Sequence, residues 1–194
     1  MSELMLDHPL DSRHGLSDSL AYLRDTYPQV EWAQHDNFGQ LASFWLDVHD
    51  GLRAEGAQLR RATEEFREGK RTAAEFQRYS APRIGRFLQG LNGHHHVEDA
   101  HYFPKFRALD PRMVAGFDLL ERDHATIHTA LVASAQSAQR FLNSIGEGPD
   151  AARRGGDSYS TESDRLLSLL LRHLSDEEDL IVPAILHHGE RSVS

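Results

Sequence analysis

The chain contains no cysteine among its 194 residues, and this absence narrows the chemistry that it can perform. Disulfides, iron–sulfur clusters, thiolate zinc sites and cysteine nucleophiles are all excluded. A metal site would therefore use imidazole nitrogen and carboxylate oxygen, ligands that suit iron, manganese or zinc. The length is that of one domain of ordinary size with a core of its own.

Long apolar runs and an excess of basic charge are missing as well. No stretch reaches the apolar length of a membrane span, and residues 1–10 carry acidic groups rather than a basic, apolar leader. The formal net charge is −9, and no basic stripe with interleaved aromatic residues is present. We therefore expect a cytoplasmic protein that binds neither nucleic acid nor membrane. The sequence identifies no protein partner.

Histidine, in contrast, is abundant, with 13 residues, and two histidines belong to a pattern that occurs twice. His94 precedes Glu98 by four residues, His173 precedes Glu177 by the same interval, and a proline follows six residues after each Glu. A His and a Glu four residues apart on a helix lie on the same face, one turn apart. Two such pairs in the same register indicate a metal site between helices.

Apolar residues recur at helical spacing almost throughout the chain, and no convincing strand-like alternation is present. The first long helix is expected to end near Gly69. The second should close at Pro104 and the Asp110–Pro111 break, after which the third helix begins. Five residues then suggest a flexible connection before a fourth helix capped by Thr161 or Ser163: Gly146, Gly148, Pro149, Gly155 and Gly156.

The expected fold is all-α, an antiparallel up-down-up-down four-helix bundle over residues 31–190. Residues 1–30 form an N-terminal extension outside this bundle. Leu16, Leu20 and Leu23 are spaced so that the extension could contain a short helix that docks on one end.

Polar residues interrupt the apolar stripe of each expected helix once, near its middle. The interruptions fall at similar distances from the turns that join neighbouring helices, to within a few ångströms at about 1.5 Å per residue. Burying these groups without compensation would cost several kcal/mol per charge, and two divalent cations would compensate them. The predicted metal ligands are five histidines and two glutamates: His49, His94, Glu98, His124, His128, His173 and Glu177.

At these residues the chain resembles the hemerythrin-like (HHE cation-binding) family, in its bacterial type. The segments that carry the resemblance are HHHVEDAHYFP, HLSDEEDLIVP, WLDVHDGLR and ERDHATIH, and it covers roughly residues 32–190. The resemblance implies a non-haem centre of two iron ions joined by carboxylate bridges and an oxo or hydroxo bridge. Carried over to this chain, Glu98 and Glu177 would be the carboxylate bridges. One iron would be bound by His124, His128 and His173, and the other by His49 and His94.

The resemblance also implies a function. The second iron would keep one position open, where dioxygen or a related diatomic ligand such as nitric oxide would bind, for oxygen storage or for oxygen or redox sensing. A binding protein is expected rather than an enzyme.

One carboxylate departs from the pattern of oxygen-transporting hemerythrins, which carry an Asp five residues after the last His. Here Glu177 stands four residues after His173, and Glu178, at five, is the less favoured substitute.

The run His94-His95-His96 is ambiguous in register. His94 is preferred because Glu98 lies one turn after it and Leu91 one turn before it, so His95 and His96 are expected outside the ligand set. His101 shares a face with Glu98 and is a candidate for a hydrogen bond near the site.

Other chemistries remain as alternatives. A di-iron oxidase or peroxide-handling enzyme of the ferritin-like class uses Glu-x-x-His pairs. Glu98–His101 and Glu121–His124 have this spacing, but they fall on adjacent helices. A mononuclear zinc hydrolase would use His124 and His128 with a carboxylate, although no HExxH motif is present. A metal-free interaction module would leave the four interrupted stripes unexplained.

Overall fold

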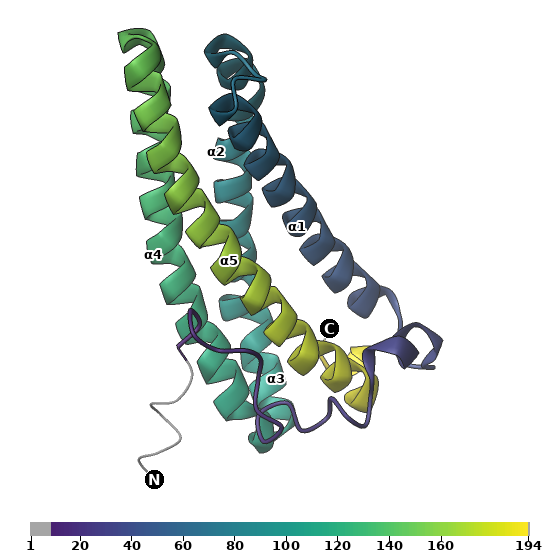
Figure 1. Ribbon diagram of the computed structural model, residues 1–194. Coiled ribbons are helices and arrows are strands. Elements are labelled where there is room, and N and C mark those ends of the chain that lie inside the picture. Colours follow the sequence, from purple (N-terminus) through teal and green to yellow (C-terminus); the bar gives the residue numbers. More distant parts are fainter. Residues whose placement is uncertain (1–8, 194) are drawn as a thin grey trace. The chain divides into compact units, whose positions relative to one another are not determined.

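The computed structural model describes residues 9–193, and every regular element in this range is a helix (Figure 1). The long helices are α1 (Gln40–Arg67), α2 (Ala73–Val97), α4 (Val114–Ser144) and α5 (Pro149–His188). A π-helical turn, η2 (Glu98–Tyr102), leads from α2 into the short helix α3 (Phe103–Leu109). The 3-10 turns are η1 (Gln29–Gln34), η3 (Pro111–Met113), η4 (Ile145–Glu147) and η5 (Glu190–Ser192).

The expected all-α class is confirmed, whereas the up-down-up-down order of the helices stays a prediction. Within residues 9–193, no helix combines the length and the apolar character that crossing a bilayer requires.

Local sequence signals account for several of the helix ends. After α1, Gly69 adopts a φ of +73°, a backbone conformation that glycine adopts at little cost and that commonly ends helices. Thr72 and Glu75 then form a capping box: the Glu75 N–H donates to Thr72 Oγ1 at 3.2 Å, and the Thr72 N–H donates to Glu75 Oε2 at 2.8 Å. Asp110, with an extended backbone, separates α3 from η3 and α4.

The connection before α5 is shorter than the sequence indicated, because Gly155 and Gly156 lie inside the helix. A Cβ atom on Gly155 would lie 3.1 Å from Phe141 Cα, and one on Gly156 would lie 2.8 Å from the ring of Phe66. These glycines therefore allow α5 to pack closely against α1 and α4. The expectation of a flexible connection was wrong for Gly155 and Gly156, because glycine serves close packing as well as flexibility.

Close packing at Gly156 predicts that Gly156→Ala destabilises the protein. The added methyl group would force Phe66 to move, so the free energy of unfolding should fall by about 1–3 kcal/mol. Gly90→Ala is the control: Gly90 is exposed in α2, and apart from its chain neighbours and the backbone of its own helix, no described residue lies within 4 Å of its added Cβ. Its unfolding free energy should rise by about 0.5–1 kcal/mol because alanine favours helix. Denaturant unfolding measures both, and a similar change in the two variants would contradict the close approach.

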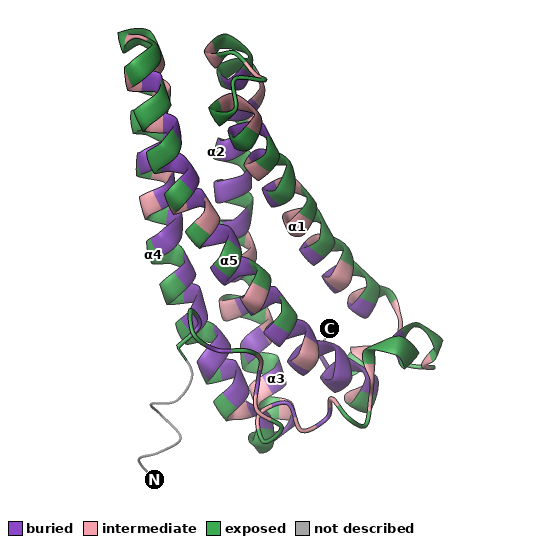
Figure 2. Cartoon of the chain, viewed as in Figure 1, coloured by how far each residue is buried: buried purple, intermediate pink, exposed green. Residues whose placement is uncertain are grey.

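The chain divides into two compact units, and each long helix contributes residues to both. Unit 1 consists of the described parts of Met1–Asp50, His95–Ala125 and Leu170–Ser194. Unit 2 consists of Gly51–His94 and Thr126–Leu169. Along each helix, buried and exposed residues recur at helical spacing, which places the apolar residues of each unit in its interior (Figure 2).

Aromatic rings fill part of the interior of unit 2. The ring centroids of Phe66, Phe76 and Phe141 lie 4.8–5.5 Å apart, and Tyr159 stacks on Phe141 at 6.0 Å. These residues come from α1, α2, α4 and α5, so their packing joins all the helical segments of this unit.

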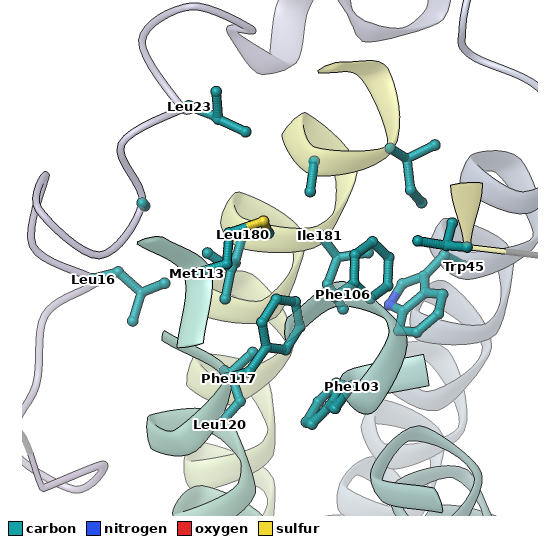
Figure 3. Packing of buried hydrophobic residues seen from close by; sticks show 14 of the residues in the cluster. Leu16, Leu23, Trp45, Phe103, Phe106, Met113, Phe117, Leu120, Leu180 and Ile181 are labelled. Atoms are coloured by element: carbon teal, nitrogen blue, oxygen red, sulfur yellow. The ribbon is translucent and has the colours of Figure 1, made fainter. Parts of the chain in front are cut away.

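The core of unit 1 is also rich in aromatic residues (Figure 3). Phe106 of α3 stacks on Phe117 of α4, with ring centroids 5.2 Å apart. Trp45 of α1 lies edge-on to Phe106 at 6.4 Å, and Ile181 of α5 belongs to the same buried cluster. Buried histidine and glutamate side chains of unit 1 contact the aromatic residues of this core.

The N-terminal segment belongs to unit 1 and contributes to its core. Residues 1–8 of the expected extension lie outside the described residues. Residues 17–27 form successive turns in place of the short helix considered from the sequence. Leu16, Ala21 and Leu23 are buried in the same cluster as Met113 and Leu180.

Candidate metal centre

Two groups of histidine and glutamate side chains lie in positions that could hold metal ions. The first group is His95, His124 and His173, all buried, and the second is His49, His94, Glu98 and Glu177. In each group, one potential ligand atom per residue lies within 4.8 Å of the others. All these residues except His94 belong to unit 1, and His94 is one helical turn before Glu98 on a continuous helix.

Helical spacing positions the ligands that share an element. On α5, His173 Nε2 lies 3.3 Å from Glu177 Oε2, one turn apart. At the end of α2, His94 and His95 precede Glu98 by four and three residues, so both are its neighbours on the helix surface. The π-helical turn begins at Glu98, whose carbonyl accepts the N–H of Phe103. Such turns are frequent at functional sites.

In the first group, imidazole nitrogens converge. His124 Nε2 and His173 Nε2 are 3.0 Å apart, and the ring of His95 stacks on that of His124 with centroids separated by 4.0 Å. Two ligand nitrogens bound to one metal at about 2.1 Å, with a right angle between the bonds, would be about 3.0 Å apart. The spacing of these nitrogens therefore fits a shared metal ion.

The two glutamates face histidines of both groups. Glu177 Oε2 lies 3.3 Å from His173 Nε2 in the first group and 3.7 Å from His49 Nε2 in the second. Glu98, which belongs to the second group, places Oε2 3.6 Å from His124 Nε2 in the first. Trp45 Nε1 donates a hydrogen bond of 3.1 Å to Glu177 Oε1 and thereby orients this carboxylate. The two groups are therefore adjacent, with carboxylates between them.

The electrostatics of the site fit cations. Burial raises the pKa of Glu98 well above its usual range, and the nearby Glu177 raises it further. Burial lowers the pKa of His173, but Asp123 and Glu177 outweigh this effect and raise it to about 9. Two neighbouring buried carboxylates such as Glu98 and Glu177 are costly unless positive charge compensates them. Divalent metal ions would provide that charge.

A further set of carboxylates faces the other ring nitrogen of three histidines. His49 Nδ1 lies 2.8 Å from Glu178 Oε1, and His124 Nδ1 lies 2.8 Å from Asp99 Oδ1. His173 Nδ1 lies 3.7 Å from Asp123 Oδ2. A carboxylate at Nδ1 stabilises the tautomer that keeps the proton there and leaves Nε2 available to a metal. This arrangement is typical of histidines that act as metal ligands.

The structure brings together six of the seven ligands predicted from sequence: His49, His94, Glu98, His124, His173 and Glu177. It does not bring His128 to either group. His128 is exposed, with Nδ1 3.2 Å from Asn92 Oδ1. His95 lies in the first group instead, although its place in the sequence predicted that it would not be a ligand.

The spacing His95-x-x-Glu98 could have identified His95, because residues three apart also share a helix face. His96 and His101 are exposed. The extra residue in the π-helical turn changes the register after Glu98, so that Phe103 and Phe106 are the buried residues of α3.

A comparison with protein families agrees with these residues. The family model described as the hemerythrin HHE cation binding domain matches residues 40–185. Neither the curated proteins nor the solved structures gave a significant match. The family match covers more than half of the chain and includes every residue of both groups, whereas the N-terminal segment precedes it. The chain therefore belongs to the hemerythrin HHE cation-binding family.

Proposed function

We propose that this protein holds two iron ions side by side and binds dioxygen, or a related diatomic ligand such as nitric oxide, at one of them. The observation that carries the proposal is the pair of adjacent groups with Glu98 and Glu177 between them. Family membership supports metal binding, and a set of donors that contains only nitrogen and oxygen suits iron.

The proposed ligand set differs in one residue from that expected from sequence. His95, His124 and His173 would bind one ion, and His49 and His94 would bind the other, with the two glutamates as bridges. Iron, when bound, supplies the redox chemistry that dioxygen binding requires. The second ion has fewer imidazole ligands than the first, and this difference leaves room for a small ligand. His128 is replaced by His95 because His128 is exposed.

Aromatic rings next to the histidines would restrict the site to small ligands. Phe103 stacks on His124 with ring centroids 5.3 Å apart, and Trp45 lies edge-on to His49 at 6.2 Å. Both aromatic residues are buried. They exclude water from the site and strengthen the electrostatic interactions within it.

A ferritin-like oxidase is less consistent with the arrangement of the ligands. Its Glu-x-x-His pairs would require His101 and Glu121 at the site, but both residues are exposed. The two groups instead contain five histidines and two carboxylates, a nitrogen-rich set. We propose reversible binding for oxygen storage or for oxygen or redox sensing.

Metal reconstitution followed by oxygenation tests this function. Metal-free protein loaded with Fe²⁺ under anaerobic conditions is expected to retain two iron ions per chain, because two groups of ligands are present. Mixing with dioxygen in a stopped-flow spectrometer should give near-ultraviolet absorption from oxo-to-iron charge transfer and an additional visible band that disappears when oxygen is removed. A single bound zinc ion, or no metal, after expression with iron would contradict the proposal. Rapid decay of the visible band with release of a product would indicate a catalyst.

A further inference from the structure

Arg13 occupies an unusual position for an arginine. Among the residues that the structure describes, it is the only lysine or arginine that is buried, with its side chain 1% exposed. It belongs to the N-terminal segment, which precedes the range matched by the family model. A buried guanidinium is costly unless carboxylates pair with it, so its partners show where its charge is used.

Arg13 pairs with two buried carboxylates that adjoin metal-site residues in the sequence. Nε donates to Asp176 Oδ2 at 2.8 Å, and Nη1 donates to Asp123 Oδ1 at 3.3 Å. Nη2 pairs with Asp123 Oδ2 as well. Asp123 immediately precedes His124 on α4, and Asp176 immediately precedes Glu177 on α5. One guanidinium therefore joins α4 to α5 beside the metal centre.

Asp123 also faces a proposed ligand directly. Its Oδ2 atom, which pairs with Nη2 of Arg13, lies 3.7 Å from His173 Nδ1. At this distance the interaction is electrostatic, because a hydrogen bond would be shorter. The resulting series of contacts runs from Arg13 through Asp123 to His173, whose Nε2 is 3.0 Å from His124 Nε2.

Other contacts hold the N-terminal segment in place without Arg13. Leu16 and Leu23 are buried in the core of unit 1. The Tyr22 hydroxyl donates to Asp110 Oδ2 at 2.5 Å, and Arg24 Nη1 donates to Asp179 Oδ2 at 3.2 Å. Removal of the Arg13 guanidinium should therefore leave the segment docked, so that its effect on the metal centre can be measured by itself.

We propose that Arg13 is a positioning residue for the three-histidine group, acting through Asp123 on His173. The inference rests on the proposed metal centre and goes beyond it, because it assigns part of the site to a segment outside the family domain. Arg13 fixes the Asp123 carboxylate by two contacts and thereby keeps this carboxylate facing Nδ1. Without Arg13, Asp123 and Asp176 would be two buried acids with less compensation, and Asp123 would lose its fixed orientation.

The test compares Arg13→Met, Arg13→Lys and Arg24→Met by anaerobic titration of the full-length, metal-free protein with Co²⁺. Cobalt is used because its visible absorption reports both its binding and its ligands. Arg13→Met should weaken binding by about 10–100-fold, the usual effect of losing a residue that orients a ligand, and should alter the cobalt spectrum. Arg13→Lys should recover part of the affinity, because it keeps the charge but cannot make all of the contacts of the guanidinium. Arg24→Met removes an ion pair between the same segment and α5, and should bind Co²⁺ as the wild type does.

Thermal unfolding of each protein, without and with metal, separates positioning from a general structural role. Positioning predicts that metal raises the melting temperature of Arg13→Met less than that of the wild type, since weaker binding gives less stabilisation. Equal metal-induced increases and equal Co²⁺ affinities in these two proteins would overturn the inference, and so would equal weakening by Arg24→Met. If Arg13→Met does not fold, Arg13→Lys decides by the same two measurements. Failure of the wild type to bind Co²⁺ or Fe²⁺ would instead refute the proposed metal centre itself.

Discussion

Replacing His95 by alanine is expected to remove one of two bound metal ions, whereas replacing His128 by alanine should leave both in place. His95 is buried in the three-histidine group, and its ring stacks on His124. Its loss leaves that group with two imidazoles. His128 is exposed, and its contact is with Asn92. Metal analysis of the two variants, purified after iron loading, measures the number of ions per chain.

The two histidine variants also differ in expected stability. His128→Ala changes an exposed side chain, so its free energy of unfolding should stay within about 0.5 kcal/mol of the wild-type value. In the presence of metal, His95→Ala should lose part of the stabilisation that binding provides. If His95→Ala kept both metal ions and His128→Ala lost metal, His128 would be the ligand, as expected from sequence, and His95 would not.

Glu177→Gln is expected to have a larger effect on metal binding than His95→Ala, because it should remove both metal ions. Glu177 is fully buried and faces histidines of both groups, whereas each histidine belongs to one group. The amide has nearly the same shape but carries no charge, so the variant loses the negative charge that would compensate a cation on either side. Fe²⁺ titration should show the loss at both positions, and metal should no longer raise the melting temperature.

The neighbouring Glu178 provides a matched comparison. It pairs with His49 Nδ1 at 2.8 Å, so it faces the ring nitrogen that is directed away from Glu177. Glu178→Gln should therefore weaken binding by about 10–100-fold without abolishing it, as is usual for a residue that orients a ligand. A greater loss from Glu178→Gln than from Glu177→Gln would contradict the assignment of Glu177 as the carboxylate shared by both groups.

The helical architecture could be predicted from sequence because it depends on local signals. Gly69 ends the first helix region through its positive φ, and the Asp110–Pro111 step separates α3 from α4, as expected. Gly155 and Gly156 carried an ambiguous signal. Glycine marks both flexible connections and close helix contacts, and the neighbouring ring of Phe66, which decides between them, is distant in sequence.

The sequence predicted what kind of site this is, a histidine and glutamate metal site. It did not predict every ligand, because some depend on contacts that residue spacing does not show. The HxxxE pairs identified His94, Glu98, His173 and Glu177, which the structure brings into the two groups. Spacing does not distinguish His95 from His128, because each lies three or four residues from another predicted ligand. The choice between them depends on which side chain is buried. Arg13 gave no signal at all, because an isolated arginine in a segment of turns has no periodicity.

X-ray diffraction from crystals of the iron-loaded protein, with anomalous data collected at the iron absorption edge, tests the central claim most directly. The expected map contains two adjacent iron peaks in each chain. One should lie among His95, His124 and His173, and the other beside His49 and His94, with Glu98 and Glu177 between them. A single peak, no peak, or a peak coordinated by His128 would contradict the account.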